Sequence, residues 1–142
     1  MAPYCICLDV GGTEIKAAAM TLAGGLLTPI ARVPSCAQAA AEPLLEHFAT
    51  LIDGLRQPKG ELAGVRLAFP GPFDYDEGIC LLQGLDKYDA WYGMNLRAAL
   101  ARRLRLPPSA FRFVNDVAAF ALGELRFGEA RGAAKSLSLI HI

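Results

Sequence analysis

LDVGGTEIK, residues 8–16, decides the fold, because one strand ends in it and the next strand begins in it. The apolar run over residues 4–10 is typical of a strand that is covered on both faces. Residues 15–22 predict its partner beyond the Gly11–Gly12 turn, and residues 26–33 predict a third strand. A doubly wound nucleotide-binding fold would place a helix directly after the first strand. The stretch therefore predicts an antiparallel meander of three strands.

After the meander, helices and strands alternate along the chain. Apolar spacing predicts helices over residues 42–55 and 96–104, strands over residues 65–69 and 111–114, and a final helix over residues 117–127. The segment PGPFDYDEG, residues 70–78, predicts an irregular ordered loop, because proline and glycine interrupt both helices and strand ladders. We therefore expect an α/β fold in which βαβ crossovers extend the meander into a mixed sheet.

The composition argues against several classes of function. The 142 residues are 54% hydrophobic and 20% charged, and their formal net charge is zero, so no basic surface for nucleic acid or an anionic membrane is expected. No apolar run approaches the ~20 residues of a membrane span, and the N-terminus lacks the basic region of a signal peptide. We expect a cytoplasmic protein whose four cysteines are reduced thiols.

Polar side chains surround the glycine turn, with Asp9 before it and Thr13 and Lys16 after it. Backbone N–H groups around such a turn can bind phosphate oxygens, while a hydroxyl adds a donor and a lysine adds positive charge. A carboxylate at a strand end can hold hydrated Mg²⁺. The alternative is an ordinary hairpin turn in which Gly11 and Gly12 supply positive φ, but that alternative leaves the polar side chains unexplained. A Walker loop would instead need GxxxxGK[ST] before a helix.

FVNDVAAFALGE, residues 113–124, forms a second constellation, in which a strand delivers Asn115 and Asp116 to the start of a helix. Asp116 could be the helix N-cap. It could also be the base of a phosphotransferase, which must sit on a rigid element facing the substrate hydroxyl, with Asn115 fixing the neighbouring hydroxyls.

A third piece is AFPGPFD, residues 68–74, in which Gly71 could let the backbone approach a small ligand closely. The alternative is a connector stiffened by proline. Further along, Asn95 is interpreted as a helix N-cap, and the alternative there is a contact that orders the ligand pocket.

Three stretches in this order and at these separations, LDVGGTEIKAAAM, AFPGPFDYDEG and FVNDVAAFALGELRFGEARG, together resemble the ROK family of bacterial sugar kinases and sugar-responsive repressors. The resemblance covers nearly all of residues 4–134 and corresponds to the N-terminal half of the family. It implies the ribonuclease-H-like, actin-like ATPase fold, in which two such domains close on ATP and sugar. Residues 1–134 would be the N-terminal sugar-kinase domain, and residues 135–142 a truncated or divergent start of a missing C-terminal domain.

The resemblance also implies roles for individual residues. Asp116 would be the catalytic base, and Asn115, Asp116 and Gly71 would contact the sugar. The residues implied to bind ATP as the first phosphate turn are Asp9, Gly11, Gly12, Thr13 and Lys16, and Asp9 would also hold Mg²⁺. The second phosphate turn, the GEIGH-like sugar ligands and the zinc site of the family have no counterpart in SLSLIHI, residues 136–142.

These matches imply an ATP- and Mg²⁺-dependent kinase that transfers the γ-phosphoryl group to a hexose hydroxyl and forms a homodimer when intact. Nucleic acid and membrane are not expected partners, and the chain itself would be an incomplete, inactive half. One alternative is a sugar-sensing transcriptional regulator of the same family, which would need a helix-turn-helix where only three residues precede the first strand. The other alternative is a non-catalytic sugar-binding fragment.

Overall fold

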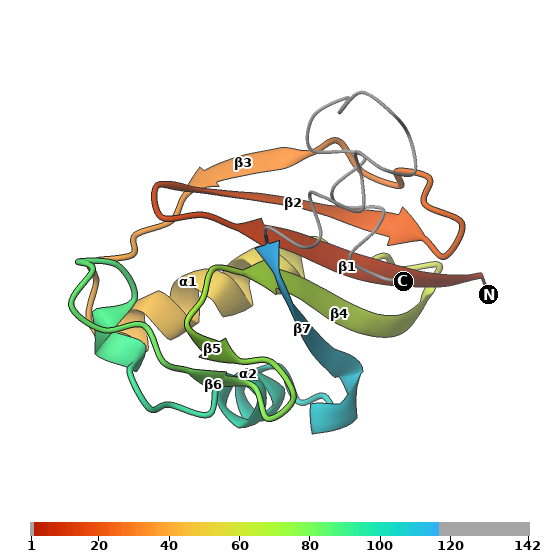
Figure 1. The fold of residues 1–142 in the computed structure, drawn as a ribbon. Coiled ribbons are helices and arrows are strands. Elements are labelled where there is room, and N and C mark those ends of the chain that lie inside the picture. The colour runs from red at the N-terminus through yellow and green to blue at the C-terminus, as the bar shows by residue number, and fades with distance from the viewer. Residues whose placement is uncertain (1, 117–142) are drawn as a thin grey trace.

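A five-stranded mixed sheet forms the centre of the computed structural model, which describes residues 2–116. Its strands are β1 (Pro3–Val10), β2 (Glu14–Thr21), β3 (Ala31–Pro34), β4 (Glu61–Phe69) and β7 (Phe111–Asn115), in the order β3-β2-β1-β4-β7 (Figure 1). The β1–β2 and β2–β3 pairs are antiparallel, whereas β4 is parallel to β1 and β7 is parallel to β4. The predicted meander with βαβ additions is therefore confirmed.

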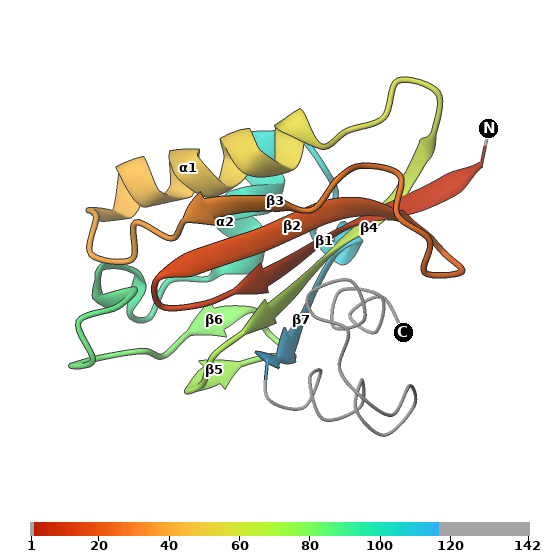
Figure 2. The same cartoon turned by 90° about the horizontal axis from the view of Figure 1, so that it is seen from above.

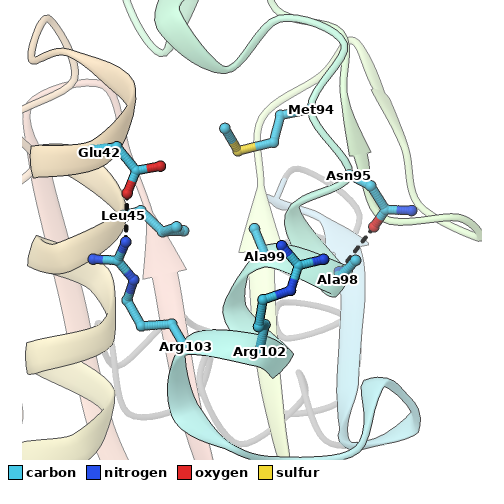
Figure 3. A pocket seen from close by; sticks show the side chains of 8 residues that line it. All are labelled: Glu42, Leu45, Met94, Asn95, Ala98, Ala99, Arg102 and Arg103. Atoms are coloured by element: carbon cyan, nitrogen blue, oxygen red, sulfur yellow. Dashed lines mark hydrogen bonds and ion pairs between the residues drawn. The ribbon is translucent and has the colours of Figure 1, made fainter.

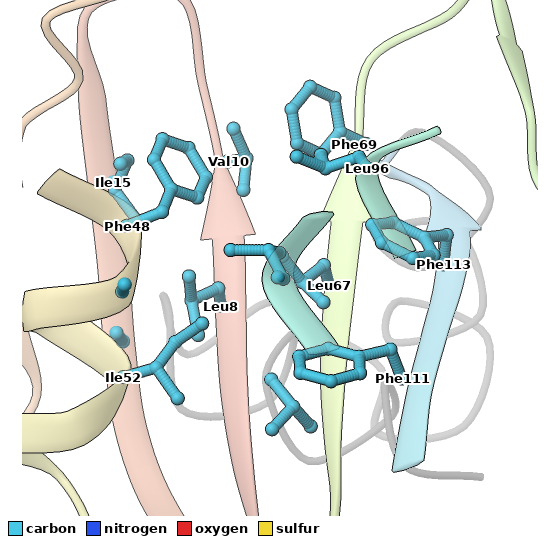
Figure 4. Packing of buried hydrophobic residues seen from close by; sticks show 14 of the residues in the cluster. Leu8, Val10, Ile15, Phe48, Ile52, Leu67, Phe69, Leu96, Phe111 and Phe113 are labelled. Carbon is cyan, nitrogen blue, oxygen red and sulfur yellow. The ribbon is translucent and has the colours of Figure 1, made fainter. Parts of the chain in front are cut away.

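Two helices, α1 (Ala41–Gly54) and α2 (Leu96–Leu104), pack on one face of this sheet. Because side chains alternate along a strand, every second residue of β1, including Leu8 and Val10, enters the core under these helices. Figure 4 shows Phe48 and Ile52 of α1 pointing toward this layer. The short 3-10 helices η1 (Asp89–Trp91) and η2 (Pro108–Ala110) complete this side of the fold.

The other side chains of β1 face the opposite surface of the sheet. Cys5 and Cys7 lie there in a smaller buried cluster with Met20 and two alanines, as the strand periodicity predicts. All four cysteines are free, and burial raises the pKa of Cys7 to about 12. Such a thiol stays protonated at neutral pH and behaves as a small apolar side chain.

Two predicted elements differ from the observed ones. The strand expected over residues 26–33 is shortened to β3, because Pro29 has no N–H for the ladder and the Thr28 hydroxyl accepts the hydrogen bond from the Ala19 N–H. Leu26 makes an isolated bridge to Met20 instead. The prediction of an irregular loop over residues 70–78 is also wrong in part, because β5 (Phe73–Asp74) pairs antiparallel with β6 (Ile79–Cys80).

The β5–β6 hairpin forms because Asp74 and Gly78 build its turn, while Pro70, Gly71 and Pro72 precede β5. The Asp74 carboxylate accepts from the Glu77 N–H, its carbonyl accepts from the Gly78 N–H, and Gly78 has a φ of 79° that suits glycine. The helix predicted over residues 117–127 and the predicted boundary at residue 135 lie outside the described residues. Among residues 2–116, no helix is long and apolar enough to cross a membrane.

Candidate functional site

The carboxyl ends of three parallel strands meet at one edge of the sheet. Asp9 near the end of β1 is level with Ala68 of β4, and Phe69 at the end of β4 is level with Asn115 at the end of β7. In Figure 2 the arrowheads of these three strands gather at the same end. The glycine turn after β1, Gly71 after β4 and Asp116 after β7 therefore all lie at this edge. Parallel α/β sheets commonly bind ligands there.

The glycine turn has a steric requirement that differs from the positive φ considered for a simple hairpin. Among residues 2–116, positive φ occurs at Gly24, Gly78, Gly84 and Gly93, and not at Gly11 or Gly12. The Gly11 N–H donates to the Glu14 carbonyl at 3.0 Å, and a Cβ on Gly11 would lie only 2.8 Å from that carbonyl oxygen. Gly11 is thus required by the closeness of the two strands.

The carbonyl groups of the turn are held by side chains and backbone from distant segments. The Tyr88 hydroxyl donates to the Gly11 carbonyl at 2.6 Å, and the Ser35 hydroxyl donates to the Gly12 carbonyl at 2.8 Å. The Ser35 N–H donates to the Thr13 carbonyl at 2.9 Å. Within residues 2–116, the N–H groups of Gly12 and Thr13 have no hydrogen-bond acceptor. The turn can therefore offer two N–H donors to an anionic ligand.

Two lysines add positive charge beside this turn. Lys16 lies directly opposite Asp9 in the β1–β2 register. Lys87 comes from the loop before η1, and its side chain passes so close to the turn that a Cβ on Gly12 would lie 3.2 Å from the Lys87 Cδ. The sequence analysis identified Lys16 but not Lys87, because nothing in the local sequence connects residue 87 with the turn.

Asp9 and Asp116 are close enough to influence each other electrostatically. Asp9 is half-buried, and burial raises the pKa of its carboxyl group; Lys16 lowers this pKa and Asp116 raises it. The two carboxyl groups thus lie at the same edge of the sheet and not on opposite sides of the molecule. Two carboxylates beside two backbone donors and a lysine form a site that can bind a phosphate together with a divalent cation.

Asn115 and Gly71 lie together beside a tyrosine that the sequence analysis did not identify. The Asn115 Nδ2 donates to the Tyr75 hydroxyl at 2.9 Å, and this hydroxyl donates to the Phe69 carbonyl at 2.7 Å. A Cβ on Gly71 would lie 3.6 Å from the Tyr75 hydroxyl oxygen and 3.7 Å from the Asn115 Nδ2. Those are ordinary contact distances, so Gly71 adjoins the pair, but no atom of residues 2–116 sterically requires a glycine at position 71.

Asn95 lies away from this edge, where it caps α2. Its Oδ1 accepts from the Ala98 N–H at 2.9 Å, so its predicted N-cap role is confirmed. It lines a pocket of about 400 Å³ between α1 and α2, together with Glu42, Arg102 and Arg103 (Figure 3). Arg103 pairs there with both Glu42 and Glu46. None of the residues predicted to bind phosphate or sugar lines this pocket.

Comparison with known proteins identifies the family. Residues 5–141 match the model of the ROK family. The chain belongs to the ROK family. One relative, the glucokinase of Halalkalibacterium halodurans, is 30% identical over 141 residues, which cover 94% of this chain and 39% of the relative.

Two solved structures have the same fold. The ROK hexokinase from Thermus thermophilus has a TM-score of 0.70 at 25% identity, over 91% of this chain and 40% of the hexokinase. The inorganic polyphosphate/ATP-glucomannokinase from Arthrobacter sp. strain KM has a TM-score of 0.69 at 30% identity, over 92% of this chain and 51% of that protein. The predicted actin-like ATPase fold is confirmed. The chain spans between 39% and 51% of the length of these relatives.

Proposed function

We propose that this ROK chain supplies the catalytic base, sugar contacts and first phosphate turn of an ATP-dependent hexose kinase. The observation that carries the proposal is the meeting of the glycine turn, Asp9, Asn115 and Asp116 at the carboxyl ends of three parallel strands. Relatives named glucokinase, hexokinase and polyphosphate/ATP-glucomannokinase support a hexose as the acceptor and ATP as the phosphoryl donor.

In the proposed reaction, Asp116 accepts the proton of a sugar hydroxyl while the hydroxyl oxygen attacks the γ-phosphorus of ATP. A new P–O bond forms to the sugar, the bond to the β-phosphate oxygen breaks, and ADP leaves. The Gly12 and Thr13 N–H groups and the Lys16 ammonium stabilise the charge on the phosphates. Asn115 and the backbone at Gly71 hold the sugar next to Asp116.

The donor set at the edge fits Mg²⁺, a hard cation that binds through one or two carboxylates together with substrate phosphates. Asp9 would hold it. The fit rests on the half-buried position of Asp9 and on the raised pKa of its carboxyl group. Burial is the main cause of this raised pKa; Lys16 lowers the pKa, and Asp116 raises it. A divalent cation would relieve this unfavourable environment for negative charge. When bound, Mg²⁺ would neutralise charge on the transferring phosphates.

The direct test of the proposed function compares this chain alone with a restored protein, defined as this chain joined to a C-terminal ROK half. Alone, the chain should release no ADP from ATP in the presence of hexoses. It spans only 39% to 51% of its relatives, and phosphoryl transfer in such kinases depends on closure of two domains around the substrates. The restored protein should show ADP release that requires ATP, Mg²⁺ and a sugar.

The measurement is coupled ADP release across a panel of hexoses and N-acetylhexosamines. Sugar affinity is measured in parallel by calorimetry. If the restored protein binds a sugar saturably but phosphorylates none, the proposed kinase function is wrong. A sugar-sensing function, such as that of a transcriptional regulator of the same family, would then be favoured. A restored protein with neither activity would contradict the proposal outright.

A second prediction follows from the electrostatics of Asp9. Its folded-state pKa is raised by burial, so the ionised form destabilises the fold, and stability is lost as the pH rises through that pKa. Asparagine cannot ionise. Asp9→Asn should therefore have a higher urea midpoint than the parent at pH 7. The difference between the two midpoints should disappear as the pH falls below about 4, where the Asp9 carboxyl group is protonated and the side chain at position 9 is uncharged in both proteins.

The matched control for this experiment is Asp76→Asn, which changes an exposed carboxylate in the β5–β6 turn. Its stability should stay within about 0.5 kcal/mol of the parent at each pH. A lower midpoint for Asp9→Asn than for the parent at pH 7 would show that the pairing with Lys16 outweighs the burial of Asp9.

A further inference from the structure

The hydrogen bonds around Tyr75 have a fixed direction. The Phe69 carbonyl can only accept, so the single hydroxyl proton of Tyr75 is given to it at 2.7 Å. The Tyr75 oxygen must then accept its second hydrogen bond, and the group 2.9 Å away is the Asn115 amide. Only the Nδ2 end of that amide can donate. The Tyr75 hydroxyl, whose own proton is directed to the end of β4, therefore requires the Nδ2 end of the Asn115 amide to face it.

The tyrosine itself is held firmly. Its ring packs on Phe73 at a centroid distance of 5.2 Å, and Phe73 stacks on Phe113 of β7 at 5.2 Å. Arg97 of α2 donates to the Asp76 carbonyl next to Tyr75 and to the Phe111 carbonyl. Burial is the main cause of a raised pKa at Tyr75, which keeps its hydroxyl protonated at neutral pH. Ring stacking and the anchored hairpin thus fix the hydroxyl position without help from Asn115.

We propose that Tyr75 is a positioning residue that holds the Asn115 amide in the orientation in which it contacts a sugar hydroxyl. This inference rests on the proposed function, because it assumes that Asn115 contacts the sugar. A site whose amide is held in place for one sugar hydroxyl discriminates against an analogue that lacks this hydroxyl.

Tyr75→Phe tests the inference in the restored protein, because phenylalanine keeps the ring and its stacking and removes only the hydroxyl. Loss of one such hydrogen bond should raise both the KM and the Kd for the sugar by about threefold to tenfold. The value of kcat should stay within about twofold, since Asp116 and the phosphate turn are unchanged. Tyr92→Phe is the matched control, because Tyr92 is 52% exposed after η1. It should behave like the parent.

A double variant distinguishes positioning from general structural support. In an Asn115→Ala background the amide is gone, so adding Tyr75→Phe should change sugar affinity by less than about twofold. A merely structural tyrosine would weaken binding to the same extent in both backgrounds. A deoxyhexose that lacks the hydroxyl bound by Asn115 should likewise bind the parent and Tyr75→Phe proteins equally.

The outcomes separate this inference from the proposed function. Unchanged sugar affinity in Tyr75→Phe, or a loss of sugar affinity that persists in the Asn115→Ala background, overturns the role of Tyr75. Neither result contradicts the proposed kinase function. A restored protein that binds sugar without phosphorylating it refutes the kinase, while the same calorimetric comparison still decides the role of Tyr75. A restored protein that binds no sugar overturns both.

Discussion

Asp116→Asn should lower the turnover of the restored protein by about 10²- to 10⁴-fold, the usual contribution of a positioned general base. Asparagine has the same shape as aspartate but does not accept a proton from the attacking hydroxyl. Sugar affinity should change little, because Asn115 and the backbone at Gly71 remain. The effect should therefore be found in kcat, with the sugar KM near its original value, and coupled ADP release measures both.

The control is Asp53→Asn on α1, where the carboxylate is exposed and forms an ion pair with Arg56 at 3.4 Å. Exposed pairs of this kind contribute about 0–1 kcal/mol, so turnover should equal that of the parent. If Asp116→Asn also turned over like the parent, Asp116 would be no more than the N-cap of the helix predicted after it. Asparagine caps helices as well as aspartate does.

The antiparallel meander could be predicted because its signals are local. The apolar runs of β1 and β2, and the glycine pair between them, specify a tight antiparallel connection within a few residues. The site residues at strand ends followed from the same signals, because the end of each parallel strand is visible in the sequence. The shortening of β3 depended on the Thr28 hydroxyl replacing a ladder partner, a contact that composition does not reveal.

The residues that hold the site could not be predicted from local patterns. Tyr88 reaches Gly11 across 77 residues, Asn115 reaches Tyr75 across 40, and Ser35 reaches Gly12 across 23. Such contacts arise only after the sheet has formed. Tyr75 also lies in the β5–β6 hairpin, which the sequence analysis treated as irregular, so the element that carries it was not recognised.

The two glycines of the turn should respond differently to substitution. Gly11→Ala should lower the free energy of unfolding by roughly 1–3 kcal/mol, as forced overpacking does, because its Cβ would lie 2.8 Å from the Glu14 carbonyl oxygen. Gly12→Val meets only the flexible Lys87 side chain, at 3.2 Å from Cβ to Cδ. It should keep the fold but block the approach of phosphate to the Gly12 and Thr13 N–H groups.

For Gly12→Val, kcat/KM for ATP should fall by about 10- to 100-fold, since a hydrogen bond to a charged group is worth about 1.5–3 kcal/mol, while the Kd for sugar stays unchanged. Urea unfolding and ATP kinetics on both variants separate the two effects. Gly54→Ala is the control for stability, because nothing lies within 4 Å of its Cβ at the end of α1. Equal use of ATP by Gly12→Val and the parent would leave the turn with a purely structural role. The carbonyl contacts from Tyr88 and Ser35 would then serve only to hold β1 and β2 in register.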